Sequence, residues 1–195
     1  MVASQLEFQD IFTDFQPKIL RYLNRLAGEN EAEDLAQETF VKVSQALENF
    51  RGESKLSTWI YRIATNTALD RMRSPSFQRD APVEQSDLLD LNDIVESADF
   101  HPVSIEKAIP VERQCVKNEM RSCLMGYIEK LPESYRTVLI LSDLEELSNK
   151  EIAEILGLSL DTIKIRLHRA REKLREELIS RCEFYWVEEL GWRVI

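Results

Sequence analysis

Two blocks of helical periodicity, separated by a segment that has none, constrain the fold of this chain most strongly. Apolar residues recur at steps of three and four over residues 8–73 and again from residue 113 onward. The chain holds five glycines and six prolines among 195 residues, too few for the many turns of an all-β protein. The sequence therefore predicts an all-α protein made of two small helical domains.

The segment between the two blocks differs in charge as well as in periodicity. Residues 76–112 carry nine acidic and two basic side chains, so this segment holds most of the chain's net charge of −10. Its 37 residues are too many for a simple connection inside a compact domain. We predict a first domain at 1–75, a flexible acidic linker at 76–112, a second domain at 113–180 and an aromatic tail at 181–195. The two ends are almost neutral, so local patches decide what they bind.

Seven helices are expected from the apolar spacing and the capping residues. In the first domain they span about 8–27, 31–49 and 57–72, with Ser57 as the N-cap of the third. In the second domain they span about 113–130, 132–146, 149–156 and 160–180. A short helix is also possible in the linker at 88–95. The sequence contains no apolar run of the roughly 18–20 residues that span a bilayer. Residues 1–8 also lack the basic segment followed by an apolar segment that is typical of a signal peptide.

The most informative motif is a helix-turn-helix pattern over residues 147–174. Ser148 followed by Glu151 predicts a capping box, Gly157 is placed to end that helix, and Ser159 to cap the next. The second helix can then lie in the DNA major groove. A basic helix face can also be solvated or paired with glutamates, and the capping signals are what favour a DNA-reading unit. Its basic residues are Lys164, Arg166, Arg169, Arg171, Lys173 and Arg175.

A second informative stretch is STWIYRIATNTALDRMR, residues 57–73. On helical spacing, polar residues at steps of four, four and three form a stripe that could bind nucleic acid. An asparagine amide can both donate and accept hydrogen bonds, and an arginine guanidinium can bind phosphate. Aromatic residues nearby favour stacking of single-stranded bases, although an aromatic residue such as Trp59, taken alone, is more often part of the core than a stacking platform. The stripe is Arg62, Asn66, Asp70 and Arg73, and the aromatic residues are Phe50, Trp59 and Tyr61.

Four blocks occur in a characteristic order. They are DLAQETFVKV at 34–43, STWIYRIATNTALDRMR at 57–73, LPESYRTVLIL at 131–141 and the helix-turn-helix ending in HRAREKLREEL. Over about residues 8–178 this order resembles bacterial sigma factors of the sigma-70 family, extracytoplasmic-function (ECF) type. The resemblance implies a non-enzymatic protein that binds core RNA polymerase and directs promoter-specific initiation. It would recognise the −35 and −10 elements and aid melting of the DNA.

The resemblance also implies roles for individual residues. The N-terminal domain resembles sigma region 2, and the helix around 34–43 would bind the polymerase β′ clamp helices, with Leu35 and Phe40 in the core. The C-terminal domain resembles region 4, which would also meet the β flap. Clamp-binding candidates are Asp34, Gln37, Glu38 and Lys42. Candidates for the −10 element are Arg51, Lys55, Trp59, Arg62, Asn66 and Arg73, and for the −35 element Lys164, Ile165, Arg166, His168, Arg169 and Arg171.

Further expectations concern partners and compartment. The resemblance implies a monomer in the holoenzyme, controlled by an anti-sigma factor, with a linker that either mimics nucleic acid in the polymerase channels or is an inert tether. An odd count of three cysteines favours the cytoplasm, and buried, inert cysteines are favoured over a metal site, so we expect neither metal nor cofactor. The tail CEFYWVEELGWRVI either packs back on the second domain or contacts a regulator.

Two other functional classes compete with this interpretation. A dimeric helix-turn-helix regulator that binds DNA alone would explain the C-terminal half, but not the blocks at 34–43 and 57–73. A hydrolase or nuclease would need catalytic groups in a pocket, yet the two histidines, His101 and His168, fall in the linker and on the DNA-facing helix.

Overall fold

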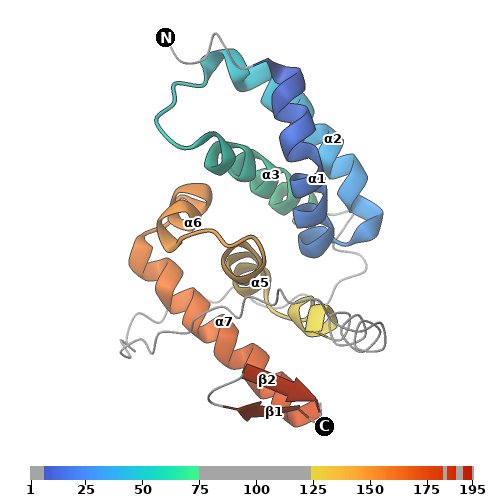
Figure 1. Cartoon of the computed structure of the whole chain (residues 1–195), viewed down its shortest axis with the longest axis vertical. Helices are drawn as coiled ribbons and strands as arrows, with labels where there is room; N and C mark the ends of the chain where they lie inside the picture. Colours follow the sequence, from blue (N-terminus) through green and yellow to red (C-terminus); the bar gives the residue numbers. More distant parts are fainter. Residues whose placement is uncertain (1–6, 75–123, 182–183, 188–190, 195) are drawn as a thin grey trace. The chain divides into compact units, whose positions relative to one another are not determined.

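The computed structural model describes residues 7–74, 124–181, 184–187 and 191–194. The predicted linker, its possible helix at 88–95, His101 and the three cysteines lie outside these residues. The described helices confirm the all-α class for both predicted domains (Figure 1). Among the residues that the structure describes, no helix is both long and apolar enough to cross a membrane.

The N-terminal part consists of three α-helices and one short 3-10 turn. They are α1 (Phe8–Ala27), α2 (Glu29–Ala46), η2 (Leu47–Asn49) and α3 (Leu56–Met72). The predicted bounds of the first helix are confirmed. Gly28 alone separates α1 from α2, and its φ of 89° is one that glycine adopts without strain. The prediction of Ser57 as an N-cap is wrong, because Lys55 holds the extended conformation of the N-cap and Ser57 already lies inside α3.

The core of this part comes from the apolar face of each helix. Leu35 and Phe40 of α2 are 0% and 3% exposed, which confirms their predicted place in the core. Burying each such side chain contributes about 1.5–3 kcal/mol. The core thus holds α3, which carries the predicted −10 residues, firmly against its neighbours. The other large, fully buried side chains of α1 and α3 are Ile19, Tyr22, Leu23, Leu26 and Ile60.

The C-terminal helices are α5 (Glu133–Leu139), η4 (Ile140–Leu144), α6 (Asn149–Leu156) and α7 (Leu160–Arg181). The predicted single helix over 132–146 is wrong in its second half. The chain changes to a π-helix at Ile140, and Glu146 takes a left-handed φ of 56°. This irregular turn closes with hydrogen bonds from the N–H of Glu145 to Ile140 O and from that of Leu147 to Leu141 O, both 3.0 Å. Of the helix predicted at 113–130, only its end is described, and residues 124–128 are helical.

The chain divides into two compact units that do not coincide with a simple N- and C-terminal split. One unit comprises Met1–Asp87 with Ile140–Ile163, and the other Leu88–Leu139 with Lys164–Ile195. The segment with η4, α6 and the start of α7 therefore belongs with α1, α2 and α3. In the tail, β1 (Phe184–Val187) and β2 (Gly191–Val194) pair antiparallel, with Trp186 opposite Trp192. This hairpin adds two strands that the sequence had not indicated.

Candidate nucleic-acid interface

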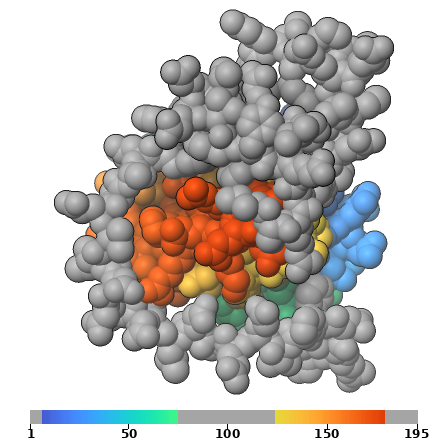
Figure 2. Space-filling model, turned by 90° about the horizontal axis from the view of Figure 1, so that it is seen from below, coloured from blue at the N-terminus to red at the C-terminus, as the bar shows by residue number. Residues whose placement is uncertain are grey.

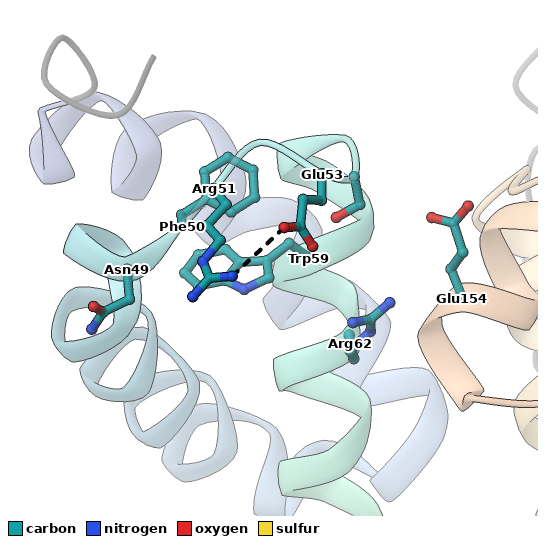
Figure 3. Close-up of a pocket in the computed structure, with 8 residues that line it drawn as sticks. Asn49, Phe50, Arg51, Glu53, Trp59, Arg62 and Glu154 are labelled. Carbon is teal, nitrogen blue, oxygen red and sulfur yellow. Dashed lines mark ion pairs between the residues drawn. The ribbon is translucent and has the colours of Figure 1, made fainter. Parts of the chain in front are cut away.

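A pocket of about 450 Å³ opens where the loop after η2 meets the first turns of α3. Figure 3 shows side chains from the loop and from α3 around it, and Glu154 on the separate ribbon of α6. Its wall combines aromatic, cationic and acidic groups. The lining residues are Asn49, Phe50, Arg51, Glu53, Ser54, Trp59, Arg62 and Glu154.

Two aromatic rings form the apolar part of this pocket. The ring centroids of Phe50 and Trp59 lie 5.0 Å apart at an interplanar angle of 43°, and both residues are half-buried. Partly exposed rings of this kind can pack against a base. The grouping of Tyr61 with them is wrong, because Tyr61 is 6% exposed and its ring packs edge-on against Tyr22 instead. On a helix, residues two positions apart point in different directions.

The polar stripe of α3 runs along the helix beside the pocket. Asn66, Asp70 and Arg73 are exposed, and Arg62 is half-buried at the pocket wall. The Nε atom of Arg62 is buried and has no hydrogen-bond partner among the residues that the structure describes. A buried cationic donor without an acceptor is costly in the free protein and would gain from an anionic ligand.

Two further predicted residues lie at the start of this surface. The Arg51 side chain is 82% exposed and stands 3.9 Å from Glu53, a pair that Figure 3 marks with a dashed line. The side chain of Lys55 is 75% exposed, and its Nζ lies 2.9 Å from an oxygen of Glu151 in α6. That hydrogen bond, with those from Ser148, lowers the pKa of Glu151 to about 2, and it raises the pKa of Lys55. Arg51, Trp59 and Arg62 thus line one pocket together with Glu53 and Glu154, whereas Lys55 pairs with Glu151 and is not among the lining residues.

The helix-turn-helix has the capping geometry that the sequence predicts. The Ser148 Oγ accepts a 3.4 Å hydrogen bond from the N–H of Glu151, whose carboxylate in turn accepts from the N–H of Ser148 at 3.0 Å. Gly157 ends α6 in the left-handed conformation, φ 65° and ψ 33°. The N–H of Thr162 donates to Ser159 Oγ at 3.1 Å, which confirms the cap of α7.

The basic residues of α7 are distributed around a helix whose apolar side is buried. Ile163, Leu167 and Ala170 are at most 3% exposed. Figure 2 shows side chains of α7, in orange to red, at the surface of the molecule. His168 Nδ1 lies 3.8 Å from a carboxylate oxygen of Glu172, one turn along the helix. Among the predicted −35 residues, Lys164 and His168 are exposed, whereas Ile165, Arg166, Arg169 and Arg171 are half-buried.

The predicted polymerase-binding residues lie on the outer face of α2. Asp34 and Gln37 are exposed, and Glu38 and Lys42 are half-buried and form a 2.9 Å ion pair. Lys42 Nζ also donates to Thr67 Oγ1 of α3 at 3.0 Å, which ties the two helices together. The neighbouring Val41 is 54% exposed, an apolar surface residue that helical spacing alone did not single out.

A buried ion pair lies beside α3, and no pattern in the sequence indicates it. The side chain of Glu145 is 3% exposed, and one of its carboxylate oxygens lies 2.7 Å from Arg25 Nη1. The other oxygen accepts a 2.7 Å hydrogen bond from the Tyr61 hydroxyl. Burial, followed by this hydrogen bond, raises the pKa of Tyr61 well above its ordinary value. These partners are 120 and 84 residues apart in the chain, so no local pattern could reveal them.

Comparison with known proteins identifies the chain. Residues 11–77 match the family described as Sigma-70 region 2, and residues 121–174 match Sigma-70, region 4. The chain is 37% identical over 179 residues to the ECF RNA polymerase sigma factor SigW of Bacillus subtilis, covering 90% of this chain and 91% of that protein. The chain is an ECF sigma factor of the sigma-70 family. It is also 33% identical over 178 residues to the ECF RNA polymerase sigma-E factor of Escherichia coli K12, covering 88% and 86% of the two chains.

Solved structures show that this sigma factor shares its fold with known members. The structure of CnrH in complex with the cytosolic domain of CnrY matches with a TM-score of 0.61 at 21% identity, covering 92% of this chain and 93% of CnrH. The sigma factor RpoE in complex with the anti-sigma factor NepR from Bartonella quintana also matches with a TM-score of 0.61, at 24% identity, covering 89% and 98%. The matches in sequence, rather than the shared fold, show that the protein functions as a sigma factor in transcription initiation.

Proposed function

We propose that this sigma factor brings core RNA polymerase to its promoters by reading the −10 element with α3 and the −35 element with α7. The pocket carries this proposal, because it combines two partly exposed aromatic rings with the buried, unsatisfied Nε of Arg62. A base extruded from the non-template strand fits such a site by stacking, and its phosphate fits the guanidinium. Stacking on an aromatic ring contributes about 1–3 kcal/mol per base.

The −10 surface consists of the pocket and the polar stripe of α3. Trp59 would contact the extruded base, and Arg51, Lys55 and Arg62 would contact its strand. Asn66 and Arg73 lie further along the helix and would meet the neighbouring nucleotides. Unstacking a base costs a few kcal/mol, and its capture in the pocket offsets that cost. The sigma factor thus favours the open promoter without catalysing a reaction, since polymerase performs the chemistry.

The −35 element would be read by α7 as the recognition helix of the helix-turn-helix. The exposed Lys164 and His168 are placed to reach base edges in the major groove, with Ile165 available for apolar contact. The guanidinium groups of Arg166, Arg169 and Arg171 would form ion pairs with backbone phosphates. The capped turn from Gly157 to Ser159 keeps the helix start fixed, which recognition requires.

Core polymerase would bind at two places. On α2, Asp34, Gln37, Glu38 and Lys42 would contact the β′ clamp helices, and the exposed Val41 supplies an apolar centre for that contact. The region 4 domain would meet the β flap. The proposed domains are region 2 at 1–75, a linker at 76–112, region 4 at 113–180 and a tail at 181–195, and the matches at 11–77 and 121–174 support the two domains.

We also assign the protein an anti-sigma partner and a place in the cytoplasm, where polymerase acts. The two solved relatives of the same fold are complexes, one with the cytosolic domain of CnrY and one with the anti-sigma factor NepR. A monomer of this chain would join one core polymerase, and the anti-sigma factor would compete for it.

The test is reconstitution with purified core polymerase. The chain plus core should start transcripts at a specific promoter set, whereas either component alone should not. A matched control is the same chain with Trp59→Ala and Arg62→Ala, which should still bind core but should open promoters poorly. Failure of the unmodified chain to associate with bacterial core polymerase would refute the proposal.

A further inference from the structure

Two buried threonines of α3 form hydrogen bonds to the two helices beside it. Thr65 and Thr67 are 0% and 2% exposed. Thr65 Oγ1 lies 2.8 Å from the Tyr22 hydroxyl of α1, and it donates its single proton to the carbonyl oxygen of Tyr61 at 2.7 Å. The Tyr22 hydroxyl is therefore the donor to Thr65. On the other side, Lys42 Nζ of α2 donates to Thr67 Oγ1 at 3.0 Å.

These two hydrogen bonds lie on either side of Asn66, an exposed member of the polar stripe. A helix of 3.6 residues per turn rotates by about 100° at each residue, so Thr65 and Thr67 flank Asn66 around the axis of α3. One threonine is held by α1 and the other by α2, the two helices that pack beside α3 in the same compact unit (Figure 1). The pair therefore fixes which way Asn66 points.

Apolar packing gives little control of rotation in this part of α3. The buried residues one turn apart are Ala64 and Ala68, both 0% exposed, and each contacts its neighbours through a single methyl group. Hydrophobic burial has no preferred direction, whereas a hydrogen bond requires a narrow range of distance and angle. At the outer radius of a helix, about 5–6 Å, a rotation of about 20° moves the end of a side chain by about 2 Å. Such a shift would break a hydrogen bond to a base edge.

We propose that Thr65 and Thr67 are positioning residues, whose hydrogen bonds to Tyr22 and Lys42 set the rotation of α3 and so aim Asn66 at the −10 element. The inference rests on the proposed function for the role of Asn66, and it adds the residues that determine how sharply Asn66 discriminates between bases. The threonines themselves are buried and touch no DNA. Their effect is on −10 sequence selectivity.

The test measures selectivity within one holoenzyme. The readout is the ratio of transcripts from a promoter that the reconstituted holoenzyme transcribes to those from the same promoter with one −10 base substituted. Because both templates meet the same holoenzyme, the ratio cancels differences in core affinity and in active fraction. Asn66→Ala should lower the ratio about fivefold or more for the base that Asn66 reads, since a well-paired amide discriminates against a wrong base by about that factor. That substituted base is then used for all other variants.

Valine and serine variants separate the hydroxyl from the packing of each threonine. Thr65→Val and Thr67→Val keep the shape and remove the hydroxyl, so each should lower the ratio about threefold or more, as loss of one hydrogen bond predicts. Thr65→Ser and Thr67→Ser keep the hydroxyl and should retain the ratio. The matched control is Thr58→Val on the same helix. Thr58 is 0% exposed, its Oγ1 has no hydrogen-bond partner among the described residues, and the ratio should not change.

A double variant tests whether Thr67 acts through Asn66. In the Asn66→Ala background, Thr67→Val should lower the ratio no further. Far-ultraviolet circular dichroism checks the fold of every variant. If Thr65→Val fails to fold, because it leaves the buried Tyr22 hydroxyl without an acceptor, Thr67→Val decides the question. The Lys42 side chain is 44% exposed, so water can replace its lost partner.

The outcomes distinguish this inference from the proposed function. Valine variants that keep the ratio while Asn66→Ala lowers it would overturn the positioning role and leave the proposed function intact. Serine variants that lose as much selectivity as the valine variants would also overturn it, because packing would then explain the effect. An unmodified holoenzyme whose transcription ignores the −10 sequence would refute the proposed function, and the positioning role with it.

Discussion

Replacing Arg62 by methionine tests the −10 surface most directly, because stability and binding should change in opposite directions. Arg62 Nε is buried without a hydrogen-bond partner among the described residues, and an unsatisfied buried donor costs about 1–3 kcal/mol. Methionine keeps an apolar stem of similar length and removes the donor. Because the residue is only half-buried, we take the lower end of that range. The free energy of unfolding in urea should rise by about 1 kcal/mol.

The same variant should bind single-stranded −10 DNA less well. Loss of one charged hydrogen bond, about 1.5–3 kcal/mol, corresponds to roughly tenfold or more in affinity. Loss of one phosphate contact should also reduce the slope of log affinity against log salt by about 0.7. The assay is a salt series of fluorescence-anisotropy titrations, with Arg21→Met as the control, since Arg21 is an exposed arginine of α1.

Two results would refute this reasoning. A loss of stability in Arg62→Met would mean that the guanidinium is a structural group with partners of its own. A salt slope equal to that of Arg21→Met would mean that Arg62 touches no phosphate.

Three other predictions address the helix-turn-helix and its neighbours. Arg169→Ala should weaken the dependence of transcription on the −35 sequence in a promoter-mutant series, and unchanged selectivity would contradict its assignment. Gly157→Ala should lower the free energy of unfolding in urea by about 1–2 kcal/mol, because the φ of this residue is 65°. A Cβ atom there would meet nothing within 4 Å, so the cost comes from the backbone conformation alone. Gly157→Asn should lower the free energy of unfolding less. The pKa of Glu151 is lowered from 4.5 to about 2, so the ionised carboxylate stabilises the fold above pH 4.5, and this contribution is lost as the pH falls toward 2. Between pH 4.5 and pH 2, the melting temperature of Glu151→Gln should therefore fall less than that of the unmodified chain.

Much of the fold could be predicted because its signals are local. The bounds of α1, the capping box at Ser148 and the left-handed Gly157 depend on residues within one or two turns of each other. Helical periodicity also placed Leu35 and Phe40 in the core. These features follow from backbone geometry and the spacing of apolar side chains, which a single sequence contains.

The candidate site was predicted less completely, because part of it depends on distant contacts. Tyr61 looked like a member of the aromatic cluster, yet its hydroxyl bonds a carboxylate 84 residues away. The change from α5 to a π-helix follows no capping residue, and it positions Glu145 for Arg25. Glu151 was predicted only as a cap, and its second bond, to Lys55, arises from the packing of α6 on α3. Periodicity identifies which face of a helix is buried, but not which segment covers it.

The pairing of cations in the free chain bears on why a sigma factor should read promoters only with polymerase. Within the compact unit that holds α1, α2, α3 and α6, Arg25, Lys42, Lys55 and Arg71 each lie within 4 Å of a carboxylate oxygen. A phosphate that binds such a cation must first displace the paired carboxylate, so the loss of that ion pair partly offsets the free energy gained from counterion release. The net charge of −10 adds long-range repulsion from DNA. On the proposed function, we therefore expect sequence-independent binding by the free chain to be weak, and promoter contacts to become favourable once core polymerase contributes additional binding free energy.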